Sequence, residues 1–147
     1  MFMYLKYNFF TFYLVLVSFP IMSSNIIVPN EETLEKPFPL PYERIDLSEN
    51  DLIGFIDNAI KNSKQPVFIF GANWCPDCRI LSAVLDLQTV KEFMNENYEI
   101  LYIDLGRYDI NMSLMEFFNI MPQQGIPRVV ILNKNKHCLL YTSDDAD

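Results

Sequence analysis

The sequence predicts an α/β domain in which helices flank a mixed central sheet. Helical and strand patterns alternate along the chain, and only the last two strands follow each other through a short turn. Strands linked through a helix pair in parallel, whereas strands linked by a tight turn pair antiparallel, so this order predicts a mixed sheet. A third observation is a Cys-x-x-Cys motif at the point where a buried strand gives way to a helix.

The chain of 147 residues, half of them hydrophobic, is long enough for one compact domain and too short for two. Its formal net charge is -8 at pH 7, and a field of that sign repels phosphate groups. We therefore expect no nucleic-acid partner, and we expect the protein to be a monomer.

Residues 1–24 have the pattern of a secretory signal peptide. Lys6 precedes an apolar run over residues 9–17, and small residues follow a breaker at Pro20. Because the run is short for a membrane span, we expect cleavage and export to the periplasm or out of the cell. The alternative is an uncleaved membrane anchor, since the apolar character continues through Ile21-Met22.

Residues 25–44 are rich in proline and predict an extended linker, which acts as a spacer or drapes over a domain at 45–147. Ser48 can cap a helix over residues 49–63, whose apolar positions recur at helical spacing. The run at residues 66–70 is apolar on both faces, which is typical of a central buried strand.

The second half of the chain completes the alternation. An apolar stripe at helical spacing begins at Pro76, breaks near residues 86–88 and then continues. The remaining elements are a core strand, a short amphipathic helix and a terminal antiparallel hairpin, over residues 98–105, 112–120, 128–132 and 137–142, with a turn at 133–136.

Other residues of this half have simpler expected roles. Cys138 is expected to be a small buried hydrophobe in the last strand, and His137 a surface turn residue. Four aromatic residues are expected in the core without a functional role: Tyr102, Tyr108, Phe117 and Phe118.

Cys75 and Cys78 are the candidate redox pair. Cys75 would cap a helix with Pro76 at its first position, where the missing N–H costs nothing. The unpaired N–H groups and the positive dipole end of a helix favour a thiolate, so Cys75 is the expected nucleophile. Cys78 lies one turn later and is more shielded, and it can attack the mixed disulfide on Cys75 to release the reduced partner.

Two other uses of this motif compete with redox exchange. An exported protein can hold a static structural disulfide. The spacing also suits zinc, but zinc needs two more ligands, and the adjacent His137 and Cys138 would point to opposite faces of a strand. We therefore expect redox exchange and no bound metal.

Residues 70–78 read Phe-Gly-Ala-Asn-Trp-Cys-Pro-Asp-Cys, and residues 124–127 read Gln-Gly-Ile-Pro before a core strand. Together they resemble the thioredoxin superfamily, and more narrowly its exported members with a Trp-Cys-Pro-Asp-Cys centre, over residues 45–142. The resemblance implies a thioredoxin fold with a cis Ile126–Pro127 bond against the active site. The backbone of Ile126 would then pair with an extended substrate chain.

The resemblance also implies a thiol-disulfide oxidoreductase with cysteine-containing client proteins and a thiol electron donor. It implies no cofactor beyond the redox-active Cys75–Cys78 disulfide, with Trp74, Pro76 and Asp77 shaping the active site. The anion at Asp77 should disfavour a thiolate at Cys75, which favours a reductase or isomerase over an oxidase.

The sequence departs from the family pattern in two places. Cytosolic thioredoxins carry a buried Asp on the central strand that accepts the proton of the resolving thiol, and Ile69 stands at that position. A bound water or a substrate group would then have to act as the base. The usual last helix has no counterpart before Asp147. These departures keep open a second hypothesis, a non-catalytic module that binds a partner in the same groove and holds a structural disulfide.

Overall fold

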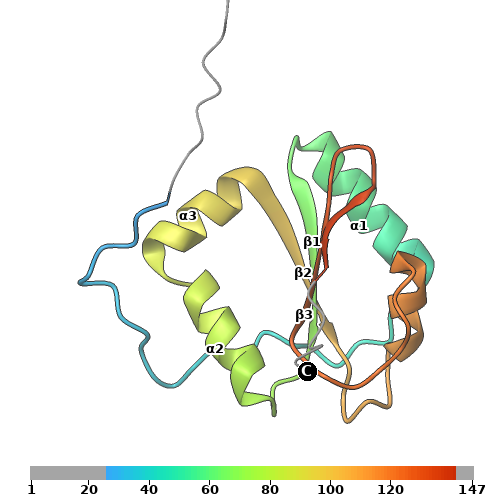
Figure 1. The fold of residues 1–147 in the computed structure, drawn as a ribbon, viewed down its shortest axis with the longest axis horizontal. Helices are drawn as coiled ribbons and strands as arrows, with labels where there is room; N and C mark the ends of the chain where they lie inside the picture. Colours follow the sequence, from blue (N-terminus) through green and yellow to red (C-terminus); the bar gives the residue numbers. More distant parts are fainter. Residues whose placement is uncertain (1–25, 142–147) are drawn as a thin grey trace, which may run out of the picture.

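The computed structural model describes residues 26–141, in which helices flank a four-stranded mixed sheet (Figure 1). The strand order is β2-β1-β3-β4, with β1 parallel to β2, β1 antiparallel to β3 and β3 antiparallel to β4. The elements in chain order are α1 (Glu49–Lys61), β1 (Gln65–Gly71), α2 (Pro76–Leu85), α3 (Gln88–Asn97), β2 (Tyr98–Asp104), the 3₁₀ helix η1 (Met112–Phe118), β3 (Arg128–Leu132) and β4 (Cys138–Tyr141). The predicted fold class and element order are confirmed.

Helices cover both faces of the sheet, as predicted. α1 and η1 lie on one side of it, and α2 and α3 lie on the other (Figure 1). A chain of ring contacts, with centroids 4.7 to 6.0 Å apart, joins Phe55 of α1, Phe68 and Phe70 of β1 and Phe118 of η1. This aromatic layer holds α1 and η1 against the central strand.

Local signals set the ends of the helices. Ser48 and Asp51 form a reciprocal capping box at the start of α1, in which the Asp51 N–H donates to the Ser48 hydroxyl and the Ser48 N–H donates to the Asp51 carboxylate at 2.8 Å. The predicted break between α2 and α3 is present. The helix predicted over 112–120 is a 3₁₀ helix of seven residues, bounded by Asn111 and Asn119 in the left-handed conformation.

The proline-rich segment 26–44 contains no helix or strand, and it drapes over the domain. The Glu32 carboxylate accepts hydrogen bonds from the backbone N–H and the hydroxyl of Thr89 on α3. Arg79 of α2 donates to the Phe38 carbonyl at 3.1 Å. These contacts hold the segment against the side of the sheet that carries α2 and α3.

Tyr42 is the residue of this segment that enters the core. It is only 4% exposed, and its ring meets that of Tyr102 edge-on, with centroids 5.3 Å apart. The packed unit therefore begins before residue 45, where the domain was expected to start. The four aromatic residues expected in the core are half-buried and pack against it: Tyr102, Tyr108, Phe117 and Phe118.

Cys138 is exposed, so the prediction of a buried position is wrong. It lies on β4, an edge strand on which Leu139 and Leu140 are also exposed. An apolar strand pattern does not reveal whether a neighbouring element covers the strand, and here solvent reaches it. His137 is exposed beside the turn, as predicted.

In the part of the chain that the structure describes, no helix is long and apolar enough to cross a membrane. Within residues 26–141 there is also no group of three or more His, Cys, Asp or Glu side chains placed to hold a metal ion. The expected signal peptide, residues 1–24, lies outside the described residues.

Candidate active site

Cys75 caps the N-terminus of α2 shortly after β1 ends. Its backbone is extended (φ -80°, ψ 118°), and Pro76 stands at the start of the helix. The Cys75 Sγ accepts a hydrogen bond from the Cys78 N–H at 3.2 Å. The sulfur therefore lies at the positive end of the helix dipole, with a backbone N–H pointing at it. The predicted helix-cap position of Cys75 is confirmed.

Cys78 lies one turn into α2 and is completely buried, whereas Cys75 keeps 4% of its surface exposed. Both thiols are free. Burial raises the pKa of the Cys78 thiol, and the adjacent Cys75 raises it further. Cys78 is therefore a neutral thiol at pH 7 and has to lose its proton before it can act as a nucleophile.

The loop before β3 lies against Cys75. Its Ile126–Pro127 peptide bond is cis, as predicted. The Cys75 thiol approaches the Ile126 carbonyl at 3.7 Å, in the geometry of a weak hydrogen bond. This contact places the redox motif beside the backbone of the cis-proline loop.

Arg128 holds the cis-proline loop in position and was not among the predicted site residues. Its side chain is 2% exposed, and it donates to the carbonyls of Gly125 at 2.7 Å and Gln124 at 2.9 Å. In the sheet it pairs with Phe70 of β1, which fixes the loop to the central strand. The sequence did contain one indication of this role, because Arg128 is a charged residue at the first position of an otherwise apolar strand.

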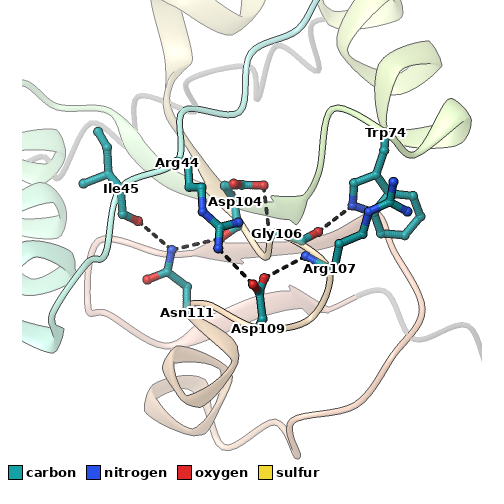
Figure 2. Close-up of polar contacts among 8 residues, drawn as sticks. All are labelled: Arg44, Ile45, Trp74, Asp104, Gly106, Arg107, Asp109 and Asn111. Carbon is teal, nitrogen blue, oxygen red and sulfur yellow. Dashed lines mark hydrogen bonds and ion pairs between the residues drawn. The ribbon is translucent and has the colours of Figure 1, made fainter.

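Trp74 lies at the rim of the site, 41% exposed. Its Nε1 donates to the Gly106 carbonyl, and the Arg107 guanidinium lies over the indole, 4.9 Å from the ring centroid (Figure 2). Tyr108 meets the indole edge-on at 5.8 Å. The loop after β2 thus supplies the contacts that hold the Trp74 side chain.

This loop is held by its own polar groups. Asp104 accepts from the Gly106 N–H at 3.1 Å, and Asp109 accepts from the Arg107 N–H at 2.8 Å (Figure 2). Arg44 adds an ion pair to Asp109 at 2.9 Å. Gly106 has a φ of +55°, where a side chain is strained, and a Cβ there would lie 2.1 Å from the Asp109 Oδ1 and would displace that carboxylate.

The sequence profile of a family described as thioredoxin-like matches residues 58–134, more than half of the chain. The chain belongs to this thioredoxin-like family. A solved disulphide isomerase from Xylella fastidiosa Temecula1 is 29% identical at a TM-score of 0.63, covering 70% of this chain and 79% of that one. Nucleoredoxin is 30% identical in Homo sapiens and 29% identical in Mus musculus, each over 108 residues. The chain spans about a quarter of the nucleoredoxin length.

At the strand position where the sequence resemblance implied a buried carboxylate, this thioredoxin-like chain has an apolar side chain. Ile69 is 1% exposed in the centre of β1. The polar group beside Cys78 comes from a different part of the chain, the hydroxyl of Tyr42, which lowers the pKa of Cys78 while burial raises it. Tyr42 was not predicted as a site residue.

Two asparagines fix the segment that carries Tyr42. The Asn73 side chain accepts from the Tyr42 N–H at 3.1 Å and donates to the Tyr42 carbonyl at 2.7 Å. Asn111 accepts from the Leu47 N–H at 2.9 Å and donates to the Ile45 carbonyl at 2.8 Å, the latter seen in Figure 2. Both asparagines satisfy backbone groups that no sheet or helix serves, so the segment is held like an extra strand.

Arg128→Met should destabilise the fold and loosen the cis-proline loop. The change removes the hydrogen bonds from Arg128 to the Gly125 and Gln124 carbonyls, and we expect a loss of roughly 2 to 4 kcal/mol in the free energy of unfolding. Urea denaturation measures this loss. Arg44→Met is the control, because its ion pair with Asp109 is solvent-exposed and should contribute little. Equal effects of the two changes would contradict the structural role of Arg128.

Proposed function

We propose that this chain is a thiol-disulfide oxidoreductase that reduces or isomerises disulfides in client proteins. The position of Cys75 carries the proposal, because its sulfur receives the Cys78 N–H at a helix start and lies 3.7 Å from the Ile126 carbonyl. A sulfur nucleophile at a helix start thus stands beside the backbone of the cis-proline loop, with which an extended client chain can pair.

In the first step, the Cys75 thiolate attacks one sulfur of a client disulfide. A bond forms between Cys75 Sγ and that sulfur, and the client S–S bond breaks. The second client sulfur leaves as a thiolate and takes up a proton. Trp74 at the rim and the backbone of Ile126 orient the client chain.

In the second step, Cys78 loses its proton and attacks the Cys75 Sγ of the mixed disulfide. The Cys75–Cys78 bond forms, the bond from Cys75 to the client breaks, and the client leaves reduced. The protein is left oxidised, and a thiol electron donor returns it to the dithiol. The two sulfurs carry the redox chemistry without a further cofactor.

Asp77 favours the reducing direction. It stands between the two cysteines on the first turn of α2 and is exposed to solvent. Its negative charge disfavours a thiolate at Cys75, and a less stabilised thiolate makes the dithiol a better electron donor. The effect of one exposed charge is small. Similarity to the Xylella disulphide isomerase supports a place among reductases and isomerases rather than oxidases.

A non-catalytic binding module is the competing function. The buried Ile69 favours it, because the strand beneath the motif offers no proton acceptor for the resolving thiol. In that case Cys75 and Cys78 would form a static disulfide, and the groove beside Pro127 would hold a partner without covalent chemistry.

Cys78→Ser should convert the protein into a covalent trap for its clients. Without the resolving thiol, the mixed disulfide on Cys75 persists, and client adducts that dithiothreitol reverses should accumulate on a non-reducing gel. Both variants carry Cys138→Ser as well, because the exposed Cys138 thiol can form adducts of its own. The variant that also lacks Cys75 and Cys78, Cys75→Ser/Cys78→Ser, is the control and should trap nothing. An absence of adducts from Cys78→Ser, with the fold intact, would favour the binding module.

The reduction potential of the Cys75–Cys78 pair should lie near that of thioredoxin, about -270 mV. Equilibration of residues 25–147 against glutathione or dithiothreitol, with thiol alkylation and mass spectrometry, measures it. A value near about -120 mV would make the protein an oxidant and overturn the direction argued from Asp77. A pair that resists reduction below about -300 mV would be a structural disulfide.

We propose export for the chain because residues 1–24 have the order of a signal peptide. When the full chain is produced in a bacterium with a periplasm, the mature protein should begin near residue 25 and be recovered outside the cytosol. Fractionation with N-terminal sequencing checks this, and Leu14→Arg, which interrupts the apolar run, is the control that should stay inside. A membrane-bound chain that keeps residues 1–24 would support the anchor, and a soluble cytosolic one would contradict export.

A further inference from the structure

The resolving cysteine needs help to ionise, and the central strand does not supply it. Burial raises the pKa of Cys78, and the residue beneath the motif on β1 is Ile69. Besides burial, the groups that act on the pKa of Cys78 are Cys75, a backbone contact at Ala72 and the Tyr42 hydroxyl. The backbone contact and the hydroxyl lower it, and the hydroxyl belongs to a side chain.

The Tyr42 hydroxyl lacks a hydrogen-bond partner within residues 26–141 of the reduced protein. It is buried, and no atom of the described residues forms a full hydrogen bond with it in the reduced state. A buried hydroxyl without a hydrogen-bond partner costs free energy. This cost would be offset in a state of the site in which the hydroxyl finds a partner. Formation of a thiolate at Cys78 would give it the partner that it lacks.

The surroundings of Tyr42 are shaped to keep the hydroxyl in place. Gly71 ends β1 next to it, and a Cβ on Gly71 would lie 2.3 Å from the Tyr42 hydroxyl oxygen. Asn73 binds both backbone groups of Tyr42, and the edge contact with Tyr102 fixes the ring. Contacts with Gly71, Asn73 and Tyr102 thus fix the position of Tyr42 at the end of β1.

We propose that the Tyr42 hydroxyl donates a hydrogen bond to the Cys78 thiolate as that thiolate forms, and so serves as the positioning residue for the release of the client. The proposal rests on the exchange function proposed above. It gives the site a neutral donor from the proline-rich segment in place of a buried carboxylate on β1.

The hydroxyl acts as a donor and not as a base. Burial is the main cause that raises the pKa of Tyr42, so the phenol stays protonated at physiological pH. The other titratable groups that act on it are Cys78, Tyr102 of β2 and Cys75.

The resolving step then balances as follows. Cys78 gives its proton to solvent, and its thiolate attacks Cys75 Sγ while the Tyr42 O–H remains bonded and donates. The Cys75–Cys78 disulfide forms, the bond from Cys75 to the client breaks, and the client thiolate takes a proton from solvent. Tyr42 is unchanged at the end of the step.

Tyr42→Phe tests the proposal in the full chain. All variants in this test carry Cys138→Ser, because the exposed Cys138 thiol would also react with the reagent. Reaction of the reduced protein with Ellman's reagent in a stopped-flow instrument then releases one coloured thiolate when Cys75 attacks and a second when Cys78 resolves the adduct. Tyr42→Phe should slow the second phase about tenfold and move the midpoint of its pH profile upward by about one unit. The first phase should not change. Because the hydroxyl forms no full hydrogen bond in the reduced protein, the melting temperature should not fall.

Tyr102→Phe is the matched control, since it removes a hydroxyl from the other ring of the same edge-on pair. It should leave the second phase and its pH profile unchanged. An unchanged second phase in Tyr42→Phe, an equal slowing in Tyr102→Phe, or loss of the Tyr42→Phe fold would each overturn the proposal. The small reagent needs no client, so a failure of the exchange function appears separately, as an absence of adducts in the Cys78→Ser trap.

Discussion

The burial of β1 on both faces is the constraint on which the rest of the structure depends. A strand at the centre of the sheet pairs with a neighbour on each side, and its C-terminal end therefore meets the end of parallel β2 and the start of antiparallel β3. The register places Gly71 opposite Asp104 and Phe70 opposite Arg128. The redox motif, the loop that holds Trp74 and the cis-proline loop consequently lie at one edge of the sheet. The apolar run of residues 66–70 is thus as important to the site as the cysteines themselves.

The segment before α1 becomes part of this site through hydrogen bonds and not through regular structure. Asn73 stands two residues before Cys75 and binds Tyr42, which is 31 residues away in sequence. Asn111, on the far side of the β2 loop, binds the backbone at Ile45 and Leu47. Side-chain amides that offer both a donor and an acceptor can hold an extended chain in one register, as a neighbouring strand would. The order of the segment therefore depends on the same two loops that surround the cysteines.

The sequence predicted what local patterns determine. The buried run of β1, the cap at Cys75, the break between α2 and α3 and the final hairpin are each encoded within a few neighbouring residues, and so is Ser48 as a helix cap. Tyr42 and Arg128 were missed because their roles depend on tertiary contacts. Nothing in a proline-rich segment shows that one tyrosine will lie under a cysteine, and an arginine at the head of a strand is compatible with solvent exposure. The prediction that Cys138 is buried was wrong for the same reason, since a strand pattern does not show which strand of the sheet is exposed to solvent.

The exchange of a carboxylate for a phenol changes the electrostatics of the site. A buried carboxylate is costly to keep ionised, and its protonation competes with its use as a proton acceptor. Tyr42 is neutral in the reduced protein, so it adds no buried formal charge to the site before the thiolate forms. The hydroxyl then stabilises the product of ionisation without taking the proton itself. Proton release to solvent or to the departing client is therefore part of the resolving step, and the step should proceed faster as the pH rises toward the pKa of Cys78, which burial holds above that of a free thiol.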